Sequence, residues 1–444
     1  MSELVADIPV RRVSDHTYFS MTKSLCRVCK KSVDAKVIIR DDAVWFDKFC
    51  PEHGAQEVIV ASSVEWYLDC LTFLAPHQPP GEFKTDVVRG CPFDCGPCAS
   101  HQQRVFLPTL PVSNQTKQNG KPHHLCREDL KAILGHLRDG RELDIINFSC
   151  GGFPLPPELP DFLAMCREAG VERLTVSTNG EGLRDEVLLR ELSALDTRIV
   201  LSLDSLRGDQ AVLELLKQEH ITVTLQPTVT EVMNDDEVND FFNVLIEQRH
   251  IVSLEINPGF STGARITIPD LHQRLEAATG GRVVSKDFVP SPLAHPHCYS
   301  ICYLLCLDDG GFVPFTRLAS RRELFGLLED SLYIEPREKM EAVFRGIIDS
   351  LWSEPSRLPE SESVLKTVKR LLREMYPENR SPLSMTERRK IGERSIKAVY
   401  IHAHMDTESF DVSRVMKCCV GEPATDGTNV PVCARDVLIE EYKS

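Results

Sequence analysis

Three cysteines in one short segment are the clearest chemical feature of the sequence. Cys91, Cys95 and Cys98 stand in the run CPFDCGPC, a C-x3-C-x2-C spacing. Three thiolates on one tight loop can each bind one iron of a [4Fe–4S] cube, and the metal favours their deprotonation. Because the cube has four irons, one iron keeps an open position, as catalytic metal centres do. A zinc site or a buried group of cysteines is the alternative.

A second group of potential ligands lies near the start of the chain. Cys26 and Cys29 are two residues apart, and Cys50 and His53 follow. This spacing is typical of a pair of metal knuckles. For the fourth ligand we expect Cys70, in a helical-looking segment, or else His53, although Cys70 could equally be a buried core cysteine. The spacing predicts a metal and leaves zinc or iron open.

A third group lies toward the end of the chain. Cys418, Cys419 and Cys433 are close enough in sequence to share a metal, and we expect Cys298 as their partner from elsewhere. Adjacent cysteines do not form a disulfide easily, and a reducing compartment favours metal binding instead. We therefore predict an auxiliary [4Fe–4S] cluster that relays electrons or ligates a substrate intermediate.

Other cysteines and histidines in the C-terminal half are better explained by packing. Cys302 and Cys306 stand in the run SICYLLCL, which we interpret as a partly buried apolar helix. His402 and His404 alternate on the predicted strand AVYIHAH. We expect them to be core histidines, although with Asp406 they could approach the mouth of a barrel.

Composition excludes several classes of protein. The chain has 444 residues, of which 42% are hydrophobic and 26% charged, and its formal net charge is −15. These values are typical of a globular protein with room for about three domains. A net acidic chain without a basic stripe disfavours nucleic acid as a partner. Because no membrane-length apolar run and no secretory signal are found, we expect a cytoplasmic protein.

The elements that must position these groups divide the chain into three parts. Residues 1–80 are expected to form a Cys-rich metal-binding domain, 81–258 a core of alternating strands and helices, and 259–444 a cluster-binding extension. We predict strands at 84–90, 144–149, 173–178, 198–203, 221–226 and 252–257. Strict alternation predicts an α/β fold, a partial (β/α)6 TIM-like barrel with its chemistry at the carboxyl ends of parallel strands.

A triad of this spacing, placed after the first strand of a β/α barrel, resembles the radical S-adenosylmethionine (SAM) superfamily. The resemblance implies that SAM chelates the open iron through its amino and carboxylate groups. It also implies that one-electron reduction, by a reductant such as ferredoxin or flavodoxin, releases a 5′-deoxyadenosyl radical. Such low-potential chemistry has to be kept away from water and oxygen.

Other strand ends fit the same resemblance. The second strand ends in GGFP where the superfamily usually has GGEP, so Phe153 is a departure, and the third ends in TNG as the superfamily does. Both segments are also common as plain turns. The fourth strand ends with a carboxylate. From the resemblance we predict the SAM-binding residues Gly151, Gly152, Thr178, Asn179 and Asp204.

A narrower resemblance covers about residues 26 to 433. The runs FCPEHG, RGCP, NDDE and HPHC and the C-terminal cysteines are similar to a subgroup that contains the archaeal tetraether lipid synthase, a sequence also labelled a dihydro-hydroxymethylpterin methyltransferase. The resemblance implies iron at the N-terminal site. It also implies hydrogen abstraction followed by carbon–carbon bond formation, as in lipid-chain coupling, or a methyl transfer to a pterin.

The sequence leaves the substrate open. A lipid predicts a long apolar groove or a peripheral contact with a membrane, against which the acidic net charge argues mildly. A pterin, as a small molecule, predicts a compact pocket with a few polar anchors. A non-catalytic iron–sulfur electron carrier is the alternative from another class of protein.

Overall fold

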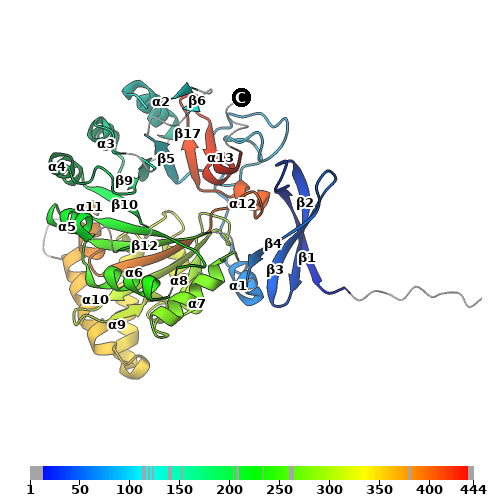
Figure 1. The fold of residues 1–444 in the computed structure, drawn as a ribbon. Coiled ribbons are helices and arrows are strands. Elements are labelled where there is room, and N and C mark those ends of the chain that lie inside the picture. Colours follow the sequence, from blue (N-terminus) through cyan, green and yellow to red (C-terminus); the bar gives the residue numbers. More distant parts are fainter. Residues whose placement is uncertain are drawn as a thin grey trace, which may run out of the picture.

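The computed structural model describes residues 14–112, 117–118, 121–122, 125–138, 143–151, 154–203, 205–206, 210–233, 235–259, 265–378 and 382–438. Gly152, Phe153 and Asp204 lie outside this range. Within it, no helix is long and apolar enough to cross a membrane. The chain forms a small N-terminal sheet and a large mixed sheet that carries helices on both faces (Figure 1).

The N-terminal sheet is antiparallel and has the order β1-β2-β3-β4. Its elements are β1 (Thr17–Leu25), β2 (Ser32–Arg40), β3 (Ala43–Cys50), β4 (Gly54–Ala61) and the following helix α1 (Val64–Cys70). Exposed and buried residues alternate along β2, so one face of the sheet packs and the other meets water. Helix α1 begins at a serine cap, where Ser63 accepts a hydrogen bond from the backbone N–H of Trp66.

The large sheet has the order β13-β14-β16-β12-β11-β10-β9-β8-β5-β17-β18, with β15 paired to β14. Strands β5 and β8 to β12 are parallel, and the C-terminal extension adds β16 and β17 parallel to them. The strands are β5 (Leu107–Pro111), β8 (Ile145–Ser149), β9 (Arg173–Thr178), β10 (Thr197–Leu203), β11 (Val223–Val229), β12 (Ile251–Pro258), β13 (Val289–Pro290), β14 (Tyr299–Cys306), β15 (Phe312–Pro314), β16 (Ile396–His402), β17 (Val420–Pro423) and β18 (Asn429–Pro431). A further small pair is β6 (Lys117–Gln118) and β7 (Lys121–Pro122).

Helices cover the large sheet on both sides. They are α2 (Arg127–Arg138), α3 (Leu159–Glu168), α4 (Glu186–Ala194), α5 (Gln210–Gln218), α6 (Asp235–Glu247), α7 (Ile268–Ala278), α8 (Arg321–Leu327), α9 (Glu338–Ser353), α10 (Ser361–Met375), α11 (Met385–Gly392), α12 (Val412–Met416) and α13 (Val432–Leu438). Alternate residues of β16 face opposite sides of the sheet. Val399 and Ile401 pack in the hydrophobic core around α2 to α7, whereas Ala398 and Tyr400 pack in the core around α8 to α10.

Five of the six predicted strands are present, and the first is not. Residues 84–90 form no strand, and the first parallel strand of the large sheet, β5, comes after the cysteine triad. The reason is local: the Asp94 carboxylate accepts hydrogen bonds from the backbone N–H groups of Val88, Arg89 and Gly90. Amide groups held by a side chain in this way are not available to a strand ladder.

The predicted helix SICYLLCL is also wrong, because this segment is strand β14. It pairs antiparallel with β16, and its residues Tyr299 to Leu305 are all buried. A short apolar run buried on both faces has no periodicity that separates a strand from a helix. Cys302 and Cys306, four residues apart on this strand, lie on the same face and pack against the core around α2 to α7. Burial raises the pKa of Cys306 to about 11.

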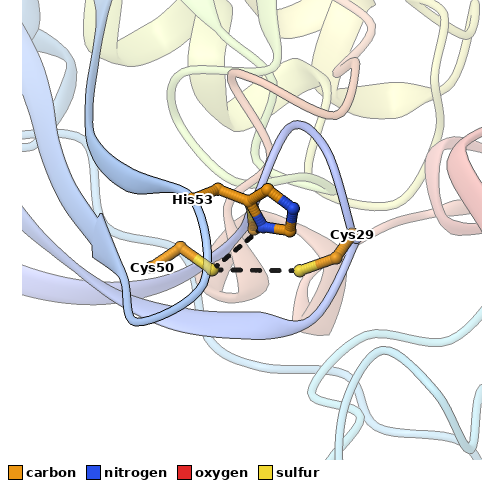
Figure 2. A group of neighbouring side chains, drawn as sticks. Cys29, Cys50 and His53 are labelled. Atoms are coloured by element: carbon orange, nitrogen blue, oxygen red, sulfur yellow. Dashed lines mark hydrogen bonds between the residues drawn. The ribbon is translucent and has the colours of Figure 1, made fainter.

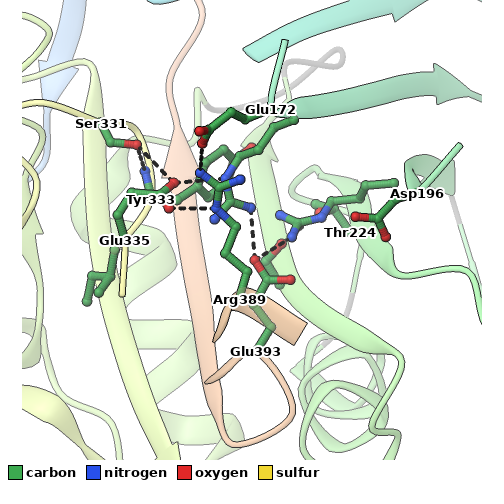
Figure 3. A network of polar contacts seen from close by, with 12 residues as sticks. Glu172, Asp196, Thr224, Ser331, Tyr333, Glu335, Arg389 and Glu393 are labelled. Carbon is green, nitrogen blue, oxygen red and sulfur yellow. Dashed lines mark hydrogen bonds and ion pairs between the residues drawn. The ribbon is translucent and has the colours of Figure 1, made fainter. Parts of the chain in front are cut away.

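A buried ionic network closes the amino ends of the parallel strands (Figure 3). Arg173 at the start of β9 pairs with Glu335 and Glu393, both at 2.9 Å. Arg198 of β10 lies 2.6 Å from Glu393, and Arg389 of α11 lies 2.6 Å from Glu335. Burial acts to raise the pKa of Glu393, but the charges of Arg198 and Arg173 outweigh it and hold the pKa at about 2.

We expect Glu393→Gln to lower the free energy of unfolding by about 3–5 kcal/mol at pH 7, because it leaves two buried arginines short of a partner. The pKa of this group is depressed in the folded state, so its contribution is present above the unfolded pKa of about 4.3 and disappears as the pH falls toward 2. Urea unfolding of both proteins at several pH values measures this. Glu341→Gln, which removes an exposed helix pair with Arg345, should cost about 0.3–0.5 kcal/mol; equal losses for the two variants would contradict the account.

Candidate functional site

The loop that carries the triad brings its thiols together in a buried setting. A hydrogen bond with Cys95, burial, and the thiolate charges of Cys95 and Cys98 all raise the pKa of Cys91. Thiols that oppose one another's ionisation in this way are stabilised as thiolates by a bound metal. The loop is also tight: a Cβ on Gly96 would meet Thr85 Oγ1 and lie 3.2 Å from Thr85 Cβ, so a larger residue there requires the Thr85 side chain to move.

The triad loop is tied to the loop that carries Cys418 and Cys419. The backbone N–H of His101 donates to the carbonyl oxygen of Cys98, and its ring Nε2 donates to the carbonyl oxygen of Cys418 at 3.2 Å. The backbone N–H groups of Phe106 and Leu107 donate to the carbonyl oxygen of Cys419, at 2.8 and 3.0 Å. Two cysteine groups that are far apart in sequence therefore share one scaffold.

The four C-terminal ligand candidates lie in one region of the structure. Burial and the thiolate charges of Cys433, Cys419 and Cys298 raise the pKa of Cys418. The side chains of Cys91 and Cys95 pack against the hydrophobic cluster that contains Cys433. Among the described residues these four sulfurs do not converge at the spacing of a single ion. An auxiliary cluster, whose irons separate its ligands further, stays a prediction.

The N-terminal group does converge on a single point. The ligand atoms of Cys26, Cys29, Cys50 and His53 all lie within 4.8 Å of one another. They come from the turn after β1 and from the end of β3 with the turn that follows it (Figure 2). Cys50 Sγ lies 3.5 Å from His53 Nδ1 and 3.9 Å from Cys29 Sγ. Three thiolates and an imidazole are a common ligand set for structural zinc. Burial opposes ionisation of Cys26, but hydrogen bonds from the backbone N–H of Cys29 and from Gln56 lower its pKa to about 6.

Cys70 does not join this group, so the alternative ligand, His53, takes the fourth place. Cys70 packs in α1 beside Trp66 and Tyr67, and burial raises its pKa to about 12. The sequence prediction put Cys70 first, although the C-x2-H spacing from Cys50 to His53 was a signal available for the histidine.

The residues predicted to bind SAM lie at the carboxyl edge of the sheet where the structure describes them. Gly151 follows β8 with φ +57°. Thr178 ends β9, is buried, and accepts a hydrogen bond from the backbone N–H of Gly180, while Asn179 accepts one from the backbone N–H of Glu181. These side chains shape a turn, and their contact with SAM remains a prediction, as do the roles of Gly152 and Asp204.

Sequence reasoning missed a row of polar side chains on one face of the large sheet. Ser202 of β10 donates to Gln226 of β11 at 2.9 Å, and Glu255 of β12 lies 3.5 Å from His402 of β16. The available signal was the alternation of polar and apolar residues in VTLQPT and SLEIN. In a parallel sheet covered by helices, polar residues at alternate positions indicate a lined cavity rather than a sealed core.

The comparisons with known proteins agree with the triad. Residues 85–245 match the radical SAM superfamily, and residues 18–62 match the HMPTM N-terminal zinc ribbon domain. This chain therefore carries a radical SAM domain. The whole chain is 26% identical, over 94% of its own length and 93% of the relative's, to a 7,8-dihydro-6-hydroxymethylpterin dimethyltransferase of Methanocaldococcus jannaschii.

Solved structures give more distant matches. Streptococcus suis SuiB bound to S-adenosylmethionine matches 40% of this chain with 16% identity and a TM-score of 0.32. SuiB bound to the precursor peptide SuiA matches 40% of this chain with 15% identity and a TM-score of 0.33. This radical SAM chain covers less than half of each SuiB chain, 44% and 46% respectively.

The residues present fit the cofactors of the superfamily. The triad supplies three thiols on one loop, with Cys98 buried and Cys91 and Cys95 partly buried. Among the described residues its sulfurs do not form a group at single-ion spacing, with or without a fourth ligand, whereas a cluster binds each sulfur to a separate iron. When bound there, the [4Fe–4S] cluster and SAM supply the 5′-deoxyadenosyl radical. The chain's own part is to hold the loop, through Asp94 and His101, and to exclude water from it.

We expect Cys50→Ser to release one metal ion per chain from the N-terminal site, because it removes a ligand of a four-ligand centre. Metal analysis by mass spectrometry measures the loss and identifies the ion. Cys70→Ala is the matched control and should keep the full metal content. A protein that loses metal on changing Cys70 but keeps it on changing Cys50 would overturn our assignment of the ligands.

Proposed function

We propose that this radical SAM enzyme uses the 5′-deoxyadenosyl radical to abstract hydrogen from a carbon of a small, planar heterocycle of the pterin class. The carbon radical would then take the methyl group of a second SAM molecule, so that the new carbon–carbon bond forms as the methyl–sulfur bond breaks, and one electron from the reductant would complete the thioether product. The similarity to a pterin dimethyltransferase along nearly the whole chain supports this choice of substrate. The observation that carries it is a compact pocket at the carboxyl ends of β12 and β16.

This pocket, the β12–β16 pocket, encloses about 730 Å³ when the solvent-filled space at its mouth is included. Its wall combines aromatic and charged groups, among them Trp66, Tyr67, His297, Arg265, Asp406 and His404. The rings of Tyr67 and His297 stack at 3.8 Å, and Arg265 pairs with Asp406 at 2.6 Å. Flat aromatic walls with a few polar anchors suit a planar heterocycle and not an extended lipid chain.

The remaining assignments complete the proposal. We retain the three-domain division at residues 80 and 258, a cytoplasmic location, reduction by ferredoxin or flavodoxin, and zinc or iron at the N-terminal site. The auxiliary [4Fe–4S] cluster would exchange an electron with the substrate radical; its proposed ligands are Cys298, Cys418, Cys419 and Cys433. The proposed SAM ligands are Gly151, Gly152, Thr178, Asn179 and Asp204.

Lipid-chain coupling is the second candidate, because apolar side chains are exposed just before the triad. Phe83, Val87 and Val88 keep 55%, 48% and 84% of their surface exposed. Apolar groups of this kind beside an active site could contact a membrane from which a lipid enters.

Anaerobic turnover of the reconstituted enzyme tests the proposal. With a strong reductant, SAM and 7,8-dihydro-6-hydroxymethylpterin, we expect 5′-deoxyadenosine together with a pterin that carries one or more additional methyl groups on carbon, measured by mass spectrometry. Cys95→Ala should reduce both products to background, because the cluster loses a ligand.

Two outcomes would contradict this reading. Nucleoside release that persists in Cys95→Ala would remove the triad from the reaction. Coupling of lipid chains in vesicles, with no change to the pterin, would replace the proposed substrate by the second candidate.

A further inference from the structure

The polar row on the large sheet converges on one carboxylate, that of Glu255. Gln226 of β11 hydrogen-bonds to Glu255, and Ser202 of β10 in turn donates to Gln226 at 2.9 Å. On the other side His402 Nδ1 lies 3.5 Å from Glu255 Oε1. The strand register places these four side chains on one face, because Ser202 pairs with Gln226, and Gln226 and Glu255 follow the pair Leu225 and Leu254. Glu255 in turn pairs with Tyr400, two residues before His402.

Glu255 lies deep in the protein and is still accessible. Burial raises its pKa above the ordinary value, whereas 23% of its side-chain surface remains exposed. Ser202 beside it is exposed as well. A side chain that is surrounded by protein atoms and yet reached by solvent lines a recess, so Glu255 faces a space that a ligand can enter.

His404 connects this recess to the β12–β16 pocket. His404 lines that pocket, and its ring is close enough to Glu255 that a proton on the ring would lower the pKa of Glu255. Its ring lies 4.0 Å from the ring of His402, which stacks on Tyr299 at 3.8 Å. Glu255 is not itself a lining residue of the β12–β16 pocket, but it adjoins the pocket through His404.

The carboxylate has acceptor capacity that the protein does not use fully. At 3.5 Å the contact with His402 is longer than a charge-assisted hydrogen bond. A carboxylate can accept two parallel hydrogen bonds from a planar pair of N–H groups, as it does from arginine. An amino group next to a ring N–H presents the same pair, and pterins carry this edge.

We propose that Glu255 recognises the substrate by accepting two hydrogen bonds from the amino group and adjacent ring N–H of a 2-amino-4-oxo heterocycle. This assignment rests on the proposed function, because it takes the pterin class as the substrate. Gln226 and His402 act as positioning residues that hold the carboxylate in its orientation.

Binding of two matched ligands to the holoenzyme tests this assignment. One ligand is 7,8-dihydro-6-hydroxymethylpterin, and the other is its analogue with oxygen in place of the 2-amino group. By anaerobic equilibrium dialysis in the presence of SAM, the wild-type protein should bind the amino compound about 10- to 100-fold more tightly, since a charge-assisted pair is lost in the analogue. Glu255→Gln should bind the amino compound weakly and lose the preference.

The controls separate the inference from a folding defect. Glu247→Gln makes the same change at an exposed site at the end of α6 and should keep both affinities. Iron content and the urea midpoint check that Glu255→Gln folds, and the two-ligand comparison on the wild-type protein needs no variant at all.

The outcomes also separate the inference from the proposed function. If the wild-type protein binds both rings equally, or if Glu255→Gln keeps the preference, the role of Glu255 is wrong and the pterin proposal stands. If the wild-type protein binds neither ring, the proposed substrate is wrong, and the assignment of Glu255 fails with it.

Discussion

Three thiolates have to be held together on one loop without a fourth protein ligand, and the structure around the triad meets this demand with backbone hydrogen bonds. The Asp94 carboxylate accepts from the N–H groups of Val88, Arg89 and Gly90, and this fixes the approach to Cys91. The Thr85 side chain packs close to Gly96, between Cys95 and Cys98, and leaves little room for a larger residue there. An open iron position depends on this rigidity, because a mobile loop could bring another ligand to the metal.

The same constraint explains how the C-terminal extension is attached. Strand β17 pairs with β5 at the edge of the large sheet, and the carbonyl groups of Cys418 and Cys419 accept hydrogen bonds from the segment between the triad and β5. The proposed auxiliary site would therefore be attached directly to the triad loop. If both groups of cysteines hold a cluster, the shared hydrogen-bonded scaffold would keep the two clusters at a fixed separation.

The sequence predicted what depends on local patterns and missed what depends on tertiary contacts. Strands β8 to β12 follow from apolar runs between amphipathic helices, and the metal knuckles follow from spacing. The strand expected at 84–90 does not form because the carboxylate of Asp94 accepts hydrogen bonds from backbone N–H groups of this segment. Strand β14 was mistaken for a helix because both of its faces are buried. The sequence did not reveal Glu255, because its environment is formed by side chains of three other strands that only the folded chain brings close to it.

The measurement that tests the central claim most directly is electron–nuclear double resonance spectroscopy of the reduced cluster with SAM labelled at its methionine nitrogen and carboxylate. The account predicts hyperfine coupling of both labels to one iron of the triad-bound cluster, with no such coupling in Cys95→Ala. A fully formed cluster that shows no coupling to either label would mean that the protein itself fills the fourth position, and this result would contradict the account.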